Sequence, residues 1–143
     1  NSITANDISD MWIQETFCTY SEALYVECMY GYDAMIKYVK NQMLSARNNK
    51  PIVGIPNVHQ KGSSDMYAKG SAILHTLRNL IDNDRLWFDI LKTMSEEFKY
   101  QTIDGRDILV FINQKSGYDF DTFYQQYFYT PNLPHLEYTL RGF

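Results

Sequence analysis

The sequence is poor in cysteine and histidine and has no long apolar run. Among its 143 residues there are 2 cysteines and 3 histidines. No apolar stretch approaches the roughly 18 residues that a transmembrane helix requires. The 13 lysines and arginines form no cluster, and the formal net charge is −4. The sequence therefore gives no indication of a membrane-spanning protein or of a nucleic-acid-binding surface.

The two cysteines are not expected to form a disulfide with each other. Cys18 and Cys28 fall within one predicted helix, where a rise of 1.5 Å per residue separates them by about 15 Å. A disulfide requires Cα atoms within roughly 7 Å. We therefore expect both cysteines to be small, buried, apolar residues.

The composition and the spacing of apolar residues predict a single all-α unit over residues 1–143. The hydrophobic fraction is 45% and the aromatic fraction 15%, which is typical of a globular protein. Residues that favour helix caps and stops divide the chain into six segments. The predicted helices run from Asp7 or Ser9 to about Tyr30, over 32–46, from Ser63 or Ser64 to about Ile81, over 83–98, from a cap at Thr102 or Asp104, and from Asp119 or Asp121.

Two segments fall outside this helical pattern. A loop rich in Asn, Pro and Gly spans residues 47–63, and loops of this length are usually functional or disordered. We expect it to lie near a substrate cleft. The segment "HLEYTL" (135–140) is strand-like and is expected to begin a further domain. Because the chain starts at Asn1 and leads directly into a helix, we expect it to be a piece of a longer protein.

Two acids in the first predicted helix point to a metal site. Glu15 and Glu22 lie two turns apart on one face of an apolar helix that has no lysine or arginine between Asp7 and Tyr32. A buried carboxylate is costly unless it is paired or binds a metal. Zinc sites use a glutamate as a ligand, and a second carboxylate commonly holds a ligating histidine. The alternative is that both acids reach solvent or pair with distant cations.

The histidines of this sequence do not complete such a site. His59, His75 and His135 lack the spacing of metal ligands, and we expect each of them to be structural.

The stretch "NSITANDISDMWIQETFCTYSEALYVE" resembles the gluzincin aminopeptidases, the family of aminopeptidase N and leukotriene hydrolase. That family carries H-E-x-x-H, eighteen further residues and then a zinc-binding Glu. Residues 1–14 supply fourteen of the eighteen, so the second His would lie five residues before Asn1. The resemblance implies that Glu15 is a zinc ligand and that Glu22 braces a ligating His. The family often reads Asn-Glu-Gly at the ligand, and Thr16 stands at the Gly position.

A second segment, "MYAKGSAILHTLRNLI", is similar to the family's Tyr-x-Lys-Gly helix. The matching tyrosine is Tyr67, followed by Lys69 and Gly70. The resemblance implies that Tyr67 donates a hydrogen bond to the oxyanion of the tetrahedral intermediate. A phenol with a pKa near 10 stays protonated at neutral pH, and such a donor is worth about 3–4 kcal/mol in the transition state. Without the flanking Lys-Gly, we would interpret Tyr67, one of 12 tyrosines in the sequence, as a core residue.

The resemblance covers nearly the whole chain and includes the aromatic segment "SGYDFDTFYQQYFYTPNLPHLEY". It implies the helical half of a thermolysin-like zinc metallopeptidase catalytic domain, acting on peptide substrates. The H-E-x-x-H part and a downstream domain of the parent protein would lie outside the chain, and we expect the fragment alone to be inactive. The alternatives are a catalytically dead homologue or helical interaction domain, and a related gluzincin that hydrolyses epoxides.

Overall fold

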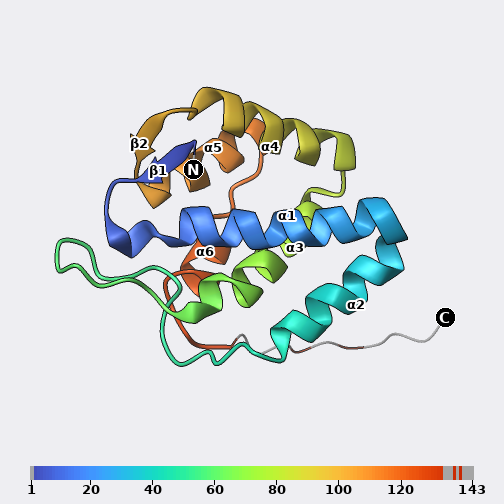
Figure 1. The fold of residues 1–143 in the computed structure, drawn as a ribbon, viewed down its shortest axis with the longest axis horizontal. Helices are drawn as coiled ribbons and strands as arrows, with labels where there is room; N and C mark the ends of the chain where they lie inside the picture. Colours follow the sequence, from blue (N-terminus) through green and yellow to red (C-terminus); the bar gives the residue numbers. More distant parts are fainter. Residues whose placement is uncertain (1, 134–136, 138, 140–143) are drawn as a thin grey trace.

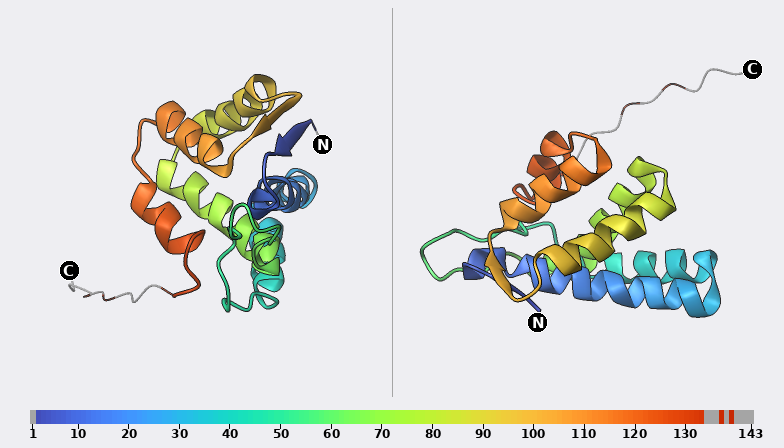
Figure 2. Two further views of the ribbon diagram at one scale, coloured as in Figure 1. Left: turned by 90° about the vertical axis from the view of Figure 1, so that its left-hand side faces the viewer. Right: turned by 90° about the horizontal axis from the view of Figure 1, so that it is seen from above.

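The structure is a computed structural model that describes residues 2–133, 137 and 139. It is a stack of helices in which α1 crosses the middle of the molecule, with α4 on one side and α2 and α3 on the other (Figure 1). Viewed from above, α5 and α6 lie on the side of α3 and α4 away from α1 and α2 (Figure 2). The elements in chain order are β1 (Ile3–Ala5), η1 (Ile8–Asp10), α1 (Trp12–Tyr30), α2 (Tyr32–Met43), η2 (Ser64–Met66), α3 (Ala68–Ile81), α4 (Asp84–Glu97), β2 (Gln101–Ile103), α5 (Gly105–Ser116) and α6 (Asp121–Tyr127).

Three of the predicted helix boundaries are confirmed, whereas α1 begins at Trp12 instead of Asp7 or Ser9 and α2 ends at Met43 instead of residue 46. Gly31 separates α1 from α2 with a φ of 88°, a conformation that glycine adopts without strain. Asn83 caps α4 by accepting a hydrogen bond from the backbone N–H of Leu86 at 3.1 Å. Asp104 caps α5 in a reciprocal capping box with Asp107. The sequence therefore determines these ends locally.

A small parallel sheet was not predicted. β1 pairs with β2, with Ile3 opposite Gln101, and the backbone N–H of Tyr100 donates to the carbonyl of Ser2. Three-residue strands are too short to show a period of two, and their pairing joins segments nearly a hundred residues apart. The helical fold class is nevertheless confirmed.

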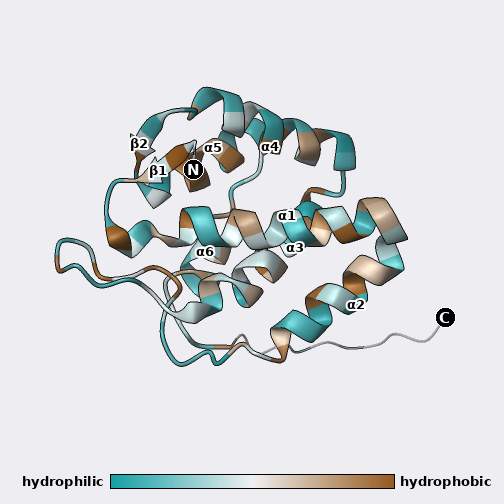
Figure 3. Cartoon of the chain, viewed as in Figure 1, coloured by the Kyte–Doolittle hydropathy of each residue, from teal (hydrophilic) through white to brown (hydrophobic). Residues whose placement is uncertain are grey.

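The core takes buried side chains from every helix from α1 to α6. Trp12 is fully buried and its ring centroid lies 4.6 Å from that of Phe128. Hydrophilic and hydrophobic bands alternate along α2 and α4, as expected for amphipathic helices (Figure 3). Two large apolar side chains of α3 and α4 are not buried: the exposed fraction is 50% for Leu80 and 43% for Phe88. Phe88 instead lies under the guanidinium of Arg78, 5.1 Å from its ring centroid.

No helix in the described part of the chain is both long and apolar enough to cross a membrane. The predicted strand 135–140 lies almost entirely outside the described residues.

Candidate functional site

The candidate site lies where α1 passes closest to the start of α3. Thr16 on α1 is fully buried, and its hydroxyl donates to the carbonyl of Met66 at 2.6 Å. A Cβ on Gly70 would collide with the side chain of Thr16, so glycine permits the helices to approach this closely. Glu15 precedes Thr16 and Tyr67 follows Met66. The crossing therefore brings these two predicted site residues together.

Tyr67 connects η2 to α3 and keeps its phenol accessible. Its side chain is 40% exposed, and its backbone (φ −78°, ψ −82°) lies just outside the helical range. Partial burial raises the pKa of the Tyr67 phenol, and the nearby negative charge of Glu15 raises it further. The phenol is therefore protonated at neutral pH and can donate a hydrogen bond.

Glu15 lies in the first turn of α1, half-buried beside Tyr67. A carboxylate at this end of a helix is favoured by the helix dipole. Within the described residues no lysine or arginine forms an ion pair with it. In the part of the chain that the structure describes, the Glu15 carboxylate is therefore without a cation partner.

Glu22 lies two turns further along α1, and its environment differs from the predicted one. Its side chain is exposed, and Oε2 accepts a hydrogen bond of 2.8 Å from the hydroxyl of Tyr38 on α2. This bond raises the pKa of the Tyr38 phenol. The expectation of two costly buried acids is wrong for Glu22, because this face of α1 is open to solvent.

The expectation that both cysteines are buried is also wrong. Cys18 and Cys28 are both exposed and free. The apolar residues of α1 nearly encircle the helix in sequence, but its neighbours cover only the face that carries Trp12, Tyr20 and Ala23. Burial on such a helix is decided by packing, which the sequence pattern does not show.

The described residues do not complete a zinc site. No group of three His, Cys, Asp or Glu side chains that could bind a metal occurs among them. His59 is exposed on the loop, and His75 is buried with its ring facing Tyr32. His135 lies outside the described residues. Glu15 fits the role of a single carboxylate ligand, and zinc sites in hydrolases use three protein ligands.

The loop between α2 and α3 is ordered by residues next to the site. The carboxylate of Asp65, which is buried, accepts hydrogen bonds from the backbone N–H groups of Arg47 and Asn48 at 2.9 and 2.7 Å. Gly54 and Gly62 lie so close to neighbouring backbone that neither could carry a Cβ without a shift. The loop base is thus fixed against η1 and η2. Whether it contacts substrate stays a prediction.

Lys69, which the resemblance singled out, is buried within α3. Burial lowers the pKa of its ammonium group, and the negative charge of Asp65 opposes that shift. Asp65 was missed by the sequence analysis because a single aspartate in the first turn of a predicted helix carries no pattern.

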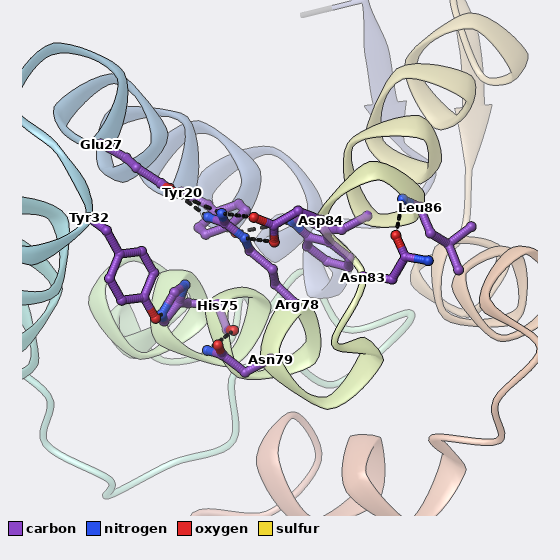
Figure 4. A network of polar contacts seen from close by, with 10 residues as sticks. Tyr20, Glu27, Tyr32, His75, Arg78, Asn79, Asn83, Asp84 and Leu86 are labelled. Atoms are coloured by element: carbon purple, nitrogen blue, oxygen red, sulfur yellow. Dashed lines mark hydrogen bonds and ion pairs between the residues drawn. The ribbon is translucent and has the colours of Figure 1, made fainter.

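A second polar network joins α1, α3 and α4 (Figure 4). The guanidinium of Arg78 is buried and donates to both oxygens of Glu27, at 2.5 and 2.9 Å, and to both oxygens of Asp84, at 2.7 and 2.8 Å. Beside it, the indole N–H of Trp87 donates to the hydroxyl of Tyr20 at 3.1 Å. This network joins the three helices, and the sequence analysis did not find it because its links from α1 span 51 and 67 residues.

Comparisons with known proteins agree with the fold. Aminopeptidase N of Lactococcus lactis subsp. lactis is 24% identical over 147 residues, covering 94% of this chain and 17% of that protein. The structure of an M1 zinc metallopeptidase mutant from Deinococcus radiodurans, bound to a Tyr-Ser-Ala substrate, superposes with a TM-score of 0.74 at 20% identity, covering 94% of this chain and 31% of that one. A further structure of the M1 zinc metallopeptidase from Deinococcus radiodurans gives a TM-score of 0.70 at 19% identity, covering 97% and 32%.

The chain thus spans less than a third of the length of these relatives, 17 to 32%. The model of the peptidase family M1 domain matches residues 1–127, which is most of the chain. The predicted gluzincin resemblance is confirmed, and this chain belongs to peptidase family M1.

Proposed function

We propose that this chain forms part of the active site of a zinc aminopeptidase, in which Glu15 is a zinc ligand and Tyr67 a hydrogen-bond donor to the oxyanion. The observation that carries the proposal is the crossing of α1 and α3, which sets the Glu15 carboxylate beside the Tyr67 phenol. Membership of family M1 supports it. The substrate class is peptides with a free amino terminus, by analogy with the aminopeptidase N relative.

The remaining zinc ligands would come from residues outside this sequence. Bound zinc would polarise the scissile carbonyl and lower the pKa of a water molecule. The part of this chain is to present one carboxylate to the metal and one protonated phenol to the developing oxyanion. Glu22, exposed two turns along α1, is proposed to hold a ligating histidine by its other ring nitrogen.

The test requires the protein in which this chain is joined to the H-E-x-x-H segment. We expect Tyr67→Phe to lower kcat on an aminoacyl anilide by about 10²–10³-fold while zinc content stays near wild type. Glu15→Gln should reduce zinc content and activity together. Tyr118→Phe, at an exposed tyrosine on another part of the surface, is the matched control and should change neither.

Equal loss of zinc and activity in Tyr67→Phe would contradict the assigned role, because a donor to the oxyanion does not hold the metal. No observation on the described residues favours the epoxide hydrolase or the non-catalytic interaction domain over a peptidase.

A further inference from the structure

Thr16 makes a contact that joins the two halves of the candidate site. Its hydroxyl donates to the carbonyl of Met66 at 2.6 Å, across fifty positions of sequence, and the residue is fully buried. We propose that Thr16 is a positioning residue that sets the Tyr67 phenol relative to the Glu15 carboxylate. The inference rests on the proposed function, since it gives Thr16 a role in the reaction assigned to those two residues.

The first step is that Thr16 fixes the peptide group that leads into Tyr67. The carbonyl of Met66 accepts the Thr16 hydroxyl, and the N–H of Tyr67 on the same peptide group donates to the carbonyl of Ser64 at 3.3 Å. With both of its polar atoms held, this peptide plane cannot rotate freely. The direction in which the Tyr67 side chain leaves the backbone depends on that plane.

The second step is that Thr16 itself has little freedom to move. The space beside it is closed by Gly70, where even a methyl group would meet the Thr16 side chain. A threonine in a helix can also direct its hydroxyl to a carbonyl of its own helix, but the Thr16 hydroxyl is directed to Met66 across the crossing. Glu15 is the residue before Thr16 in the same helix.

Thr19 provides a matched comparison on the same helix. It is also buried, and its hydroxyl donates to the carbonyl of Glu15 at 2.8 Å, four residues earlier in α1. That bond stays within one helix and does not reach η2 or α3. A substitution at Thr19 removes a buried hydroxyl from the same helix and leaves the hydrogen bond between Thr16 and Met66 in place.

The experiment uses the NMR signal of the Tyr67 ring as a reporter of the distance to Glu15. The 143-residue chain is labelled with ¹³Cζ-tyrosine, and Tyr67→Phe identifies the resonance. At pH 7 we measure how far Glu15→Gln changes the chemical shift of the Tyr67 resonance. The measurement is made in the wild type and in the Thr16→Val, Thr16→Ser and Thr19→Val backgrounds. Valine keeps the shape of threonine without the hydroxyl, and serine keeps the hydroxyl.

We expect Glu15→Gln to move the Tyr67 resonance in the wild type, in Thr16→Ser and in Thr19→Val, and to lose most of that effect in Thr16→Val. An unchanged effect in Thr16→Val, or an equal loss in Thr16→Ser, would overturn the inference. If Thr16→Val does not fold, Thr16→Cys, which carries only a weak donor, replaces it with the same expectations.

In the protein with a complete zinc site, Thr16→Val should lower kcat by on the order of 10²-fold, the cost of a displacement near 1 Å. KM and zinc content should stay close to wild type, and Thr16→Ser should restore kcat. A rise in KM alone would count against a positioning role. If the NMR effect depends on Thr16 but the complete protein has no peptidase activity, the proposed function is wrong. The conclusion that Thr16 sets the position of Tyr67 relative to Glu15 would still hold.

Discussion

Thr16 fills the space that Gly70 leaves open on α3, and their contact brings two helices together at the candidate site. Any side chain larger than hydrogen at position 70 would collide with Thr16. In the family this chain resembles, the position of Thr16 is often glycine. Here the glycine at position 70, which the family's Tyr-x-Lys-Gly pattern also carries, leaves the room that the larger Thr16 side chain occupies.

We expect Gly70→Ala to destabilise the chain, although alanine is the better helix former. Alanine in place of a helical glycine gains roughly 1 kcal/mol, whereas overpacking a core costs about 1–3 kcal/mol. We expect the cost of the clash to exceed the gain in helix propensity, because the hydrogen bond to Met66 keeps Thr16 from moving aside. Urea unfolding of Gly70→Ala, Thr16→Gly and the double variant measures the coupling. A coupling below about 0.5 kcal/mol would be inconsistent with this contact.

Arg78 is expected to be the most sensitive charged residue of the fold. Arg78→Leu would leave Glu27, whose side chain is 21% exposed, without its cation. Removing one partner of a buried ion pair lowers the free energy of unfolding by about 3–5 kcal/mol. Because the Asp84 side chain is 65% exposed, we expect a decrease near the lower value. Chemical denaturation measures it.

The matched control for Arg78 is Lys92→Ala, since the pair of Lys92 with Glu96 spans 4.0 Å on an exposed face. It should change the free energy of unfolding by less than about 1 kcal/mol. Comparable effects from the two variants would show that Arg78 does not join the helices as its contacts indicate.

His75 should make the chain less stable as the pH falls below about 6.5. Burial lowers the pKa of the His75 ring, and the positive charge of Arg78 lowers it further, while Glu27 and Asp84 act in the opposite direction. The unfolded state then takes up a proton first, near pH 6.5. The contribution of neutral His75 to the free energy of unfolding is fully present above that pH. As the pH decreases below it, the free energy of unfolding decreases by at most about 1.4 kcal/mol per pH unit.

Unfolding of the His75→Gln variant between about pH 7.5 and 5 should show a flatter dependence on pH than the wild type. His59→Gln, at an exposed loop histidine, should retain the wild-type dependence. The assignment to His75 would be refuted by identical slopes in wild type and His75→Gln.

The 143-residue chain alone is expected not to hold stoichiometric zinc or to cleave an aminoacyl anilide. Glu15 is one carboxylate, and the described residues contain no group of three ligands. Metal analysis after dialysis and an anilide assay test this expectation. Tight one-to-one zinc binding by the chain would show that a site forms without residues from outside this sequence.

The sequence by itself determined the helices and those of their ends that lie at Gly31, Asn83 and Asp104. Gly31, Asn83 and Asp104 act on backbone groups within a few residues, so their effect is visible in a local pattern. The segments around Glu15 and Tyr67 also identified the family, because each motif is contiguous. The roles of Glu15, Glu22 and Tyr67 stay predictions.

Only the tertiary structure decided which faces are buried and which distant residues meet. The β1–β2 pairing, the exposure of Cys18 and the Arg78 network all depend on which elements pack together. Thr16 shows the reason most clearly. In the sequence it is a departure from a motif, and its role appears only when α1 crosses α3, because a hydrogen bond across fifty residues leaves no trace in local spacing.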